Sequence, residues 1–313
     1  MPKPLNPPED IRAALPVSSI LPAVLDQARA ARALIEAGEQ TVGFPTGIPA
    51  LDIELGGLQP GMHALAAEPG AGKTALSLQI ARHGASRGLP TVIVTFDETR
   101  RQLALKIAAS LAGMTASKVA QGRVDPEPLA RAAEQHHDVL RLIEIIDGDA
   151  ELRPEDVVDV LGEALARHKA RIGLLIVDYL QAWASCFQSS KYEFRQTIGD
   201  LVARLRKAVI VHNCPLLVIS AQNRDKRGEA SLSSFAESSD IEYRADGAYV
   251  LTHDKDAMVS APMRGVVLNV EKTRFGAVGT RVPLILNGAT GVIGERMSSG
   301  QVDEMIEARK RRA

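Results

Sequence analysis

AAEPGAGKTALSLQIA, residues 66–81, is the stretch of sequence that decides the fold. The apolar run HALAA leads into it and a helical pattern leads out, so strand, loop and helix come in the order of a phosphate-binding loop. Gly70 and Gly72 let backbone N–H groups turn inward, and the helix N-terminus adds donors, which together form a cradle for phosphate. The first position of such loops is usually glycine. Ala67 stands there instead, and we expect it to be tolerated because the residue that ends the strand does not need a positive φ.

This loop predicts ATP and Mg²⁺ as ligands. Lys73 is placed to reach the β- and γ-phosphates, and the hydroxyl of Thr74 is a ligand for Mg²⁺. The residues expected to bind the nucleotide are Glu68, Pro69, Gly70, Ala71, Gly72, Lys73, Thr74 and Ala75.

Two other apolar runs end in carboxylates. LLIVD, residues 174–178, places Asp178 at the C-terminal end of a buried strand, where ligands of open α/β sheets gather, so Asp178 is the expected metal ligand beside Thr74. TVIVTFDE places Asp97 and Glu98 at the end of another strand, and at least one of them is expected to act on the attacking water. The alternative for these two acids is an N-cap and a first-turn acid of the helix that follows.

The order of the apolar runs predicts an α/β fold. HALAA, TVIVTF, LIEII, GLLIVDYL and PLLVIS are separated by segments of helix length such as residues 74–86 and 154–168, which indicates a mainly parallel sheet flanked by helices. After Ser220, the runs AYVLTH, GVVLNVEK and RVPLILN follow one another closely, with glycine in the turns. They predict an antiparallel C-terminal extension of the sheet.

Three regions are expected along the chain: a proline-rich arm and linker helix in residues 1–42, a motor domain in residues 43–298, and a basic tail in residues 299–313. From Pro22 to Ala37 apolar residues recur at helical spacing, with Gly38 placed as the C-cap. This helix either packs on its own domain or docks on a neighbouring copy.

Composition excludes several classes of protein. The 38 acidic and 37 basic residues give a formal charge of -1, so any site for a polyanion must be local. The two cysteines, Cys186 and Cys214, lie far apart, which argues against a disulfide framework or a zinc site. No apolar run approaches the roughly 20 residues that cross a bilayer. We expect a cytoplasmic protein with no membrane partner.

Several further motifs resemble one family. TGIPALDIELGGLQPG, the phosphate loop, FDETRRQL, IVDYLQ, ISAQNR, FAESSDIEYRAD and EKTRFGAVGT stand in the order found in the motor domain of DnaB-type replicative helicases, which are RecA-like ATPases. The resemblance covers about Thr46 to Gly288. In such motors the first loop position is frequently alanine, as at Ala67. The sequence given contains no counterpart of the family's N-terminal collar domain, which suggests a motor from an accessory element or one reassigned to another task.

The resemblance implies roles for individual residues. It makes Lys73 and Thr74 the phosphate and magnesium residues and Asp178 the Walker B carboxylate, and it leaves the catalytic acid open between Asp97 and Glu98. Gln222 in ISAQNR resembles the polar residue that senses the γ-phosphate, one place away from its usual position. Lys272 and Arg274 in EKTRFG resemble the basic pair that one subunit extends into the ATP site of its neighbour.

Single-stranded DNA is the expected polymer partner, bound by charged loops. NRDKRGEAS offers Arg224, Lys226 and Arg227, and QSSKYEFRQ offers Lys191 and Arg195. The sequence predicts a ring of six identical subunits that couples ATP hydrolysis to movement on DNA, with replication proteins as further partners. The alternatives are a RecA/KaiC-like recombination or repair mediator that does not unwind DNA, and an ATP-gated assembly scaffold.

Overall fold

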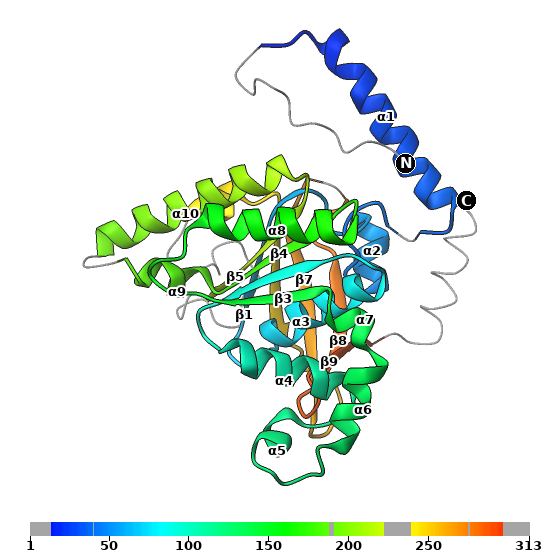
Figure 1. Cartoon of the computed structure of the whole chain (residues 1–313), viewed down its shortest axis with the longest axis vertical. Coiled ribbons are helices and arrows are strands. Elements are labelled where there is room, and N and C mark those ends of the chain that lie inside the picture. The colour runs from blue at the N-terminus through cyan, green and yellow to red at the C-terminus, as the bar shows by residue number, and fades with distance from the viewer. Residues whose placement is uncertain (1–13, 40, 188–190, 222–238, 275, 297–313) are drawn as a thin grey trace.

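The computed structural model describes residues 14–39, 41–187, 191–221, 239–274 and 276–296, and these form a single sheet flanked by helices (Figure 1). The sheet order is β3-β2-β4-β5-β1-β6-β7-β8-β9. The first six strands in this order, β3, β2, β4, β5, β1 and β6, are parallel to one another. The last three, β7, β8 and β9, each run antiparallel to the strand before them. The strand bounds are β1 Gly61–Ala67, β2 Thr91–Thr95, β3 Ile143–Asp147, β4 Leu174–Asp178, β5 Pro215–Ala221, β6 Gly247–His253, β7 Met263–Thr273, β8 Arg281–Asn287 and β9 Val292–Glu295.

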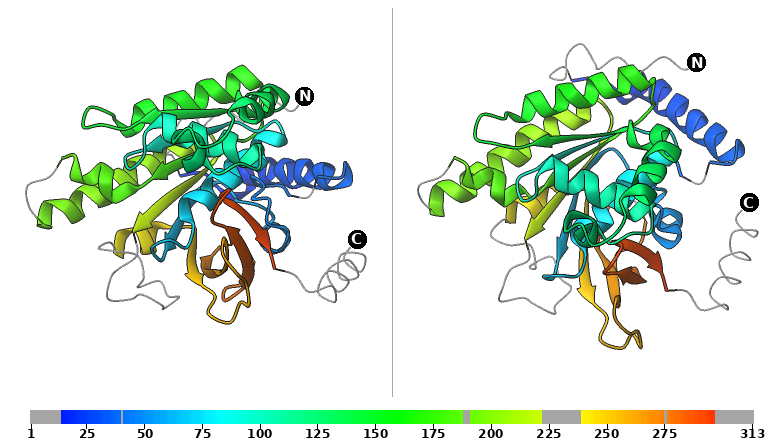
Figure 2. Two further views of the ribbon diagram at one scale, coloured as in Figure 1. Left: turned by 90° about the horizontal axis from the view of Figure 1, so that it is seen from below. Right: turned by 60° about the horizontal axis from the view of Figure 1, so that its bottom comes forward.

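Helices cover both faces of the parallel part (Figure 2). Because crossovers between parallel strands are right-handed, the reversal of strand order after β3 puts α3 and α4 on one face and α8 and α10 on the other. The helix bounds are α1 Val17–Glu36, α2 Pro49–Leu55, α3 Lys73–Ser86, α4 Arg100–Leu111, α5 Ala116–Ala120, α6 Glu127–Gln135, α7 His137–Leu140, α8 Pro154–His168, α9 Leu180–Ser185, α10 Lys191–Val211 and α11 Ser239–Arg244.

The register of the strands defines two edges of the sheet. Ala67 at the end of β1 pairs with Ala221 of β5 and with Leu251 of β6, and Thr95 at the end of β2 pairs with Asp178 of β4. We call this side, where the parallel strands end, the loop edge. The side where β1 and β6 begin is the start edge, and the antiparallel β7 ends there because Thr273 pairs with Gly247.

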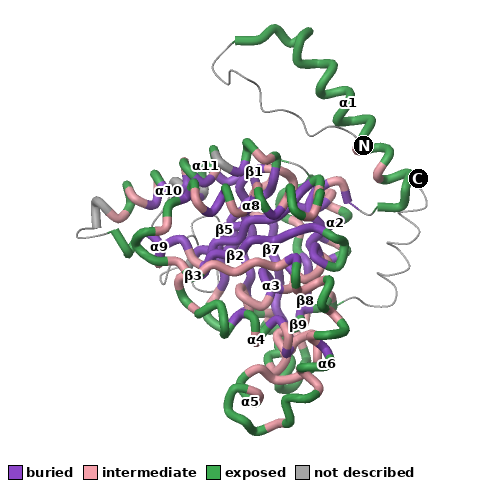
Figure 3. The backbone as a smooth tube through the Cα atoms, in the orientation of Figure 1, coloured by how far each residue is buried: buried purple, intermediate pink, exposed green. Residues whose placement is uncertain are grey.

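The core lies along the central strands, which are buried on both faces (Figure 3). The five residues of β4 are all buried, which explains the uninterrupted apolar run in the sequence. Trp183 of α9 is fully buried and stacks on Phe96, with 5.1 Å between the ring centroids. Trp183 therefore fills the core, and its ring is not exposed to a nucleic-acid base.

The predicted parallel sheet and its antiparallel extension are confirmed. The predicted start of the first helix is wrong, because α1 begins at Val17 and takes Pro22 into its second turn. At this position Pro22 has no N–H to donate to the carbonyl oxygen of Ser18, so the helix contains it at a cost in stability. Gly38, at φ +91°, follows the end of the helix as expected.

A second correction concerns QSSKYEFRQ, which we expected to be a loop. Lys191 and Arg195 lie in the first turns of the long helix α10. The helix reaches them because Ile198, Leu201 and Val202 recur at helical spacing and are buried against the sheet. Arg195 is exposed on this helix.

Candidate nucleotide site

The phosphate loop runs from the end of β1 to the start of α3 and depends on two glycines in the left-handed region. Gly70 has φ +77° and Gly72 has φ +100°. A Cβ atom built on Gly72 would come within 2.8 Å of Cδ2 of Leu286, so the loop has no room for a side chain at this position. The backbone therefore turns into α3 in the way that the sequence predicts, with Lys73 and Thr74 in the first turn of the helix.

Thr74 and Asp178 meet at the loop edge although 104 positions separate them in the sequence. The hydroxyl of Thr74 donates a hydrogen bond to Oδ2 of Asp178 at 3.1 Å. The other carboxylate oxygen, Oδ1, is buried and has no hydrogen-bond partner among the described residues. Burial raises the pKa of Asp178, whereas the charge of Lys73 and the bond from Thr74 act in the opposite direction. A hard cation is the kind of ligand that this unpartnered oxygen lacks.

Lys73 is the charged residue of the loop. Its Nζ lies 4.9 Å from the centroid of the Tyr179 ring, which directly follows Asp178 in the sequence. An ammonium group over an aromatic face is held by a weak attraction that a triphosphate, with its higher charge density, can replace. The side chain is thus already placed at the loop edge.

Asp97 and Glu98 lie beside these residues because β2 and β4 end together. Both acids contribute to the raised pKa of Asp178, so their negative charges face the same space. Glu98 forms an ion pair with Lys106 of α4, with Nζ to Oε1 at 2.6 Å. The Asp97 side chain is exposed. The predicted N-cap role belongs to neither acid, since Thr99 caps α4 in a capping box with Gln102.

Strands β6 and β7 lie beside the phosphate loop and contact it. The sequence did not predict these contacts. The backbone N–H of His253 donates to Oε2 of Glu68 at 3.2 Å, and Nε2 of its ring is 3.2 Å from the carbonyl oxygen of Pro69. Nη1 of Arg264 donates to the carbonyl oxygen of Gly70 at 3.3 Å. These contacts depend on the pairing of β6 with β1, which no local pattern encodes.

The predicted basic pair is not at the loop. Lys272 lies near the end of β7 and Arg274 directly follows this strand at the start edge, where Nε of Arg274 pairs with Oδ1 of Asp246 at 2.7 Å. Nζ of Lys272 donates to the carbonyl oxygen of Tyr243 at 3.1 Å. Asp246 also accepts the backbone N–H of Met62, and five residues of β1, about 17 Å of extended strand, separate Met62 from the loop.

The remaining predicted site residues cannot be placed. Gln222, Arg224, Lys226 and Arg227 lie outside the described residues, as does the side chain of Lys191. The strand that leads to Gln222 ends at the loop edge, because Ala221 pairs with Ala67.

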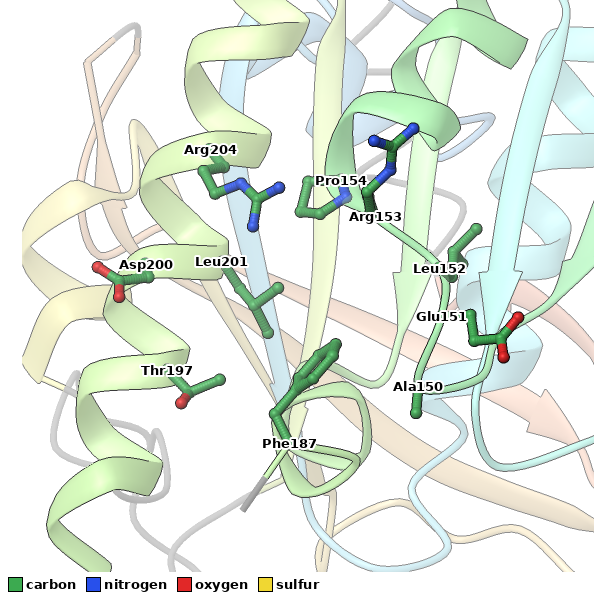
Figure 4. Close-up of a pocket in the computed structure, with 10 residues that line it drawn as sticks. All are labelled: Ala150, Glu151, Leu152, Arg153, Pro154, Phe187, Thr197, Asp200, Leu201 and Arg204. Carbon is green, nitrogen blue, oxygen red and sulfur yellow. The ribbon is translucent and has the colours of Figure 1, made fainter.

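A pocket of ≈ 210 Å³ lies between the N-terminus of α8 and the first half of α10 (Figure 4). Phe187 points toward it, and Arg204 of α10 is held by an ion pair with Glu155. None of its lining residues belongs to the phosphate loop, so the pocket is separate from the site.

Two features are absent from the described residues. No group of three or more His, Cys, Asp or Glu side chains gathers there as a metal site. Within the same residues, the helices are all too short or too polar to span a bilayer.

Comparisons with known proteins agree on one family. Residues 43–290 match the family model of the DnaB-like helicase C-terminal domain. The replicative DNA helicase DnaB of Geobacillus stearothermophilus is 25% identical over 252 residues, which are 78% of this chain and 54% of that protein. A probable plasmid replicative DNA helicase of Chlamydia trachomatis serovar L2 is 27% identical over 246 residues, 76% of this chain and 52% of that one. The chain spans about half the length of the curated relatives it matches.

Solved structures show the same likeness in fold. One solved ATPase domain superposes with a TM-score of 0.74 at 19% identity, covering 91% of this chain and 100% of that structure. A DnaB-like replicative helicase, solved to describe its interactions with primase, superposes with a TM-score of 0.70 at 19% identity, covering 90% of this chain and 67% of that one. At this identity the matches establish the fold alone.

Proposed function

This chain belongs to the family of the DnaB-like helicase C-terminal domain, and on that premise we propose that it is an ATP-hydrolysing helicase motor that moves along single-stranded DNA. The observation that supports this most is the meeting of Lys73, Thr74 and Asp178 at one edge of the sheet. The loop residues Glu68 to Ala75 supply backbone donors and a cation for a triphosphate.

The donor set also fits Mg²⁺. The hydroxyl of Thr74 and the unpartnered Oδ1 of Asp178 are oxygen ligands of the kind that Mg²⁺ binds, alone or through water. The ion supplies positive charge against the charge that develops on the transferred phosphoryl group. Asp178 has to be ionised for this role, and the charge of Lys73 favours the ionised form.

Asp97 and Glu98 are the proposed groups that orient and deprotonate the attacking water. Both stand at the loop edge next to Asp178. The carboxylate of Glu98 is held by its ion pair with Lys106, whereas the exposed Asp97 is open to a bound ligand. Gln222 is proposed to sense the γ-phosphate from the end of the neighbouring β5.

Arg274, with Lys272, is proposed to complete the site of a second copy of the chain. The start edge lies about 17 Å along β1 from the chain's own loop, and this separation supports a role for the pair in the site of another subunit. A subunit that offers a loop on one edge and an arginine on the other would make a head-to-tail contact, and such contacts form a ring when the rotation between subunits closes. We propose a ring of six.

DNA is proposed to contact Arg224, Lys226 and Arg227, with Lys191 and Arg195 of α10 as a second group. Arg224, Lys226 and Arg227 follow β5 in the sequence, and β5 ends at the loop edge beside the phosphate loop. Replication proteins, primase among them, are proposed as partners on the strength of family membership.

The test is ATP turnover and strand separation on a forked duplex. Lys73→Ala and Asp178→Asn should each lower kcat at least about 100-fold, since they remove the phosphate cation and the metal ligand. Lys118→Ala, an exposed lysine on α5, is the matched control and should leave kcat unchanged.

Each outcome separates one activity from another. Substantial steady-state hydrolysis by Lys73→Ala would refute the nucleotide site. DNA-stimulated hydrolysis without strand separation would favour a recombination mediator, and hydrolysis that DNA does not stimulate would favour an assembly scaffold.

A further inference from the structure

Arg274 shares its carboxylate with a second arginine. Nε of Arg274 lies 2.7 Å from Oδ1 of Asp246, and Nη2 of Arg206, from α10, lies 3.0 Å from the same oxygen. The other oxygen of Asp246 accepts the backbone N–H of Met62 at 2.9 Å. Two guanidinium groups thus converge on one carboxylate at the start edge, a geometry that places two like charges close together.

The two arginines differ in how firmly they are held. The side chain of Arg206 is 29% exposed and its Nε is buried without a hydrogen-bond partner among the described residues, whereas the side chain of Arg274 is 58% exposed. The carboxylate between them is only 9% exposed. Arg206 is therefore fixed in the body of the protein, and Arg274 is the one that can swing away into solvent.

This difference matters because a buried carboxylate is costly to leave without a counter-ion. If Arg274 were the sole counter-ion of Asp246, each movement of Arg274 toward a phosphate would leave the buried negative charge of Asp246 unpaired. With Arg206 in place, Asp246 stays paired when Arg274 leaves. The repulsion between the two guanidinium groups also weakens the hold on Arg274.

We propose that Asp246 and Arg206 are positioning residues for Arg274. Asp246 holds the arginine at the start edge by an ion pair. Arg206 keeps the carboxylate of Asp246 paired when Arg274 leaves it for the triphosphate bound by the next copy of the chain. This inference rests on the proposed trans role of Arg274 and adds how that residue is held and freed.

The critical variant is Arg206→Met, which keeps an unbranched apolar stem and removes the charged guanidinium group. Arg274 then becomes the partner on which Asp246 depends, so kcat for ATP should fall about tenfold. KM and the Kd for a fluorescent ATP analogue should stay unchanged, because the chain's own loop is intact. Arg206→Lys keeps the charge and should retain most of the wild-type rate.

The double variant Arg206→Met with Asp246→Asn tests the reason for the loss. The asparagine oxygen can still accept the N–H of Met62, but the charge that holds Arg274 is gone, so kcat should recover at least about threefold relative to Arg206→Met alone. Arg204→Met is the matched control, since Arg204 lies on the same helix and pairs with Glu155 instead. It should keep the wild-type rate.

The failures are distinguishable. A wild-type kcat in Arg206→Met, or a double variant that stays as slow as Arg206→Met, would overturn the positioning role and leave the proposed function standing. A wild-type kcat in Arg274→Ala would instead remove the trans role itself. Circular dichroism and urea unfolding of each variant show whether a slow rate comes from misfolding. If Arg206→Met is unfolded, Arg206→Gln replaces it, because it also removes the charge and should show the same fall in kcat, and a wild-type kcat in that variant would overturn the positioning role.

Discussion

At the scale of single residues, the site depends on groups with one interaction missing. Asp178 has one oxygen bonded to Thr74 and one buried oxygen with no partner among the described residues. A buried polar atom without a partner costs stability, so such atoms are rare in folded proteins unless a ligand completes them. The unpartnered oxygen of Asp178 therefore does not stabilise the chain by itself, and it fits the magnesium-bound nucleotide proposed for this site.

Gly72 is the residue at which the loop tolerates least change. An alanine there combines the strain of φ +100° with a Cβ atom 2.8 Å from Leu286, so Gly72→Ala should lower the free energy of unfolding by about 2–3 kcal/mol. Gly88→Ala is the control. Its φ is +77° but no atom lies within 4 Å of an added Cβ, so about 1 kcal/mol is expected. Urea unfolding of both variants compares them, and equal losses would contradict the steric part of the explanation.

Local sequence was enough to predict some site residues and not others. Lys73, Thr74 and Asp178 could be predicted because each role is tied to a short motif at the end of an apolar run. Arg206 could not, since it stands 68 positions before Arg274 on a helix whose pattern indicates only packing. Its partnership with Asp246 exists because α10 packs near the start of β1, a consequence of tertiary structure.

At the scale of elements, α1 differs from the helices that cover the sheet in its exposure. None of its residues is buried, and it projects from the body (Figure 1). Its exposed large apolar side chains are Val17, Ile20, Leu21, Val24, Leu25 and Ile35. Of the two interpretations left open by the sequence, the described structure does not show the helix packed on its own domain. A face of this size is usually covered by another chain.

Removal of apolar side chains from α1 should change the oligomeric state of the protein and leave the fold of the sheet and its covering helices intact. Leu21→Ser with Leu25→Ser should shift the protein toward smaller species in light scattering, because the apolar area available for a neighbour is reduced. The free energy of unfolding should change by less than about 0.5 kcal/mol, since these side chains are exposed. Arg29→Ser on the same helix is the control and should leave the oligomer unchanged. Loss of the oligomer in both variants would point to a general effect on the helix.

Element boundaries were predicted well where packing and local preference agree. Helix α8 begins at Pro154 and ends at His168, as its pattern indicates, because proline favours the first turn and the buried face repeats evenly. The predictions failed at the N-terminal ends of α1 and α10, because each helix begins earlier in the sequence than expected. The sequence could not predict which strands lie beside β6, because its pairing with β1 on one side and with β7 on the other depends on the whole sheet.

At the scale of the whole molecule, the change from parallel to antiparallel strands separates the phosphate loop from Arg274. The parallel strands bring Lys73, Asp97 and Asp178 to the loop edge, and the antiparallel β7 carries Arg274 back to the start edge. On the proposal that Arg274 acts on a neighbouring copy, one chain carries two half-sites on opposite edges, and a head-to-tail contact between two copies would complete one site. Repetition of such a contact gives a ring when the rotation between copies closes.

Mixed assemblies test this arrangement directly. Lys73→Ala subunits lack a working loop but keep Arg274, whereas Arg274→Ala subunits keep the loop and lack the arginine, so each protein alone should be inactive. In a random equal mixture, a contact is productive when an intact loop meets an intact arginine, which occurs at about a quarter of contacts whatever the ring size. Co-assembled protein should therefore regain about a quarter of the wild-type ATP turnover. If both residues acted within one chain, no mixture would recover any activity, and a fully active monomer at assay concentration would exclude the shared site.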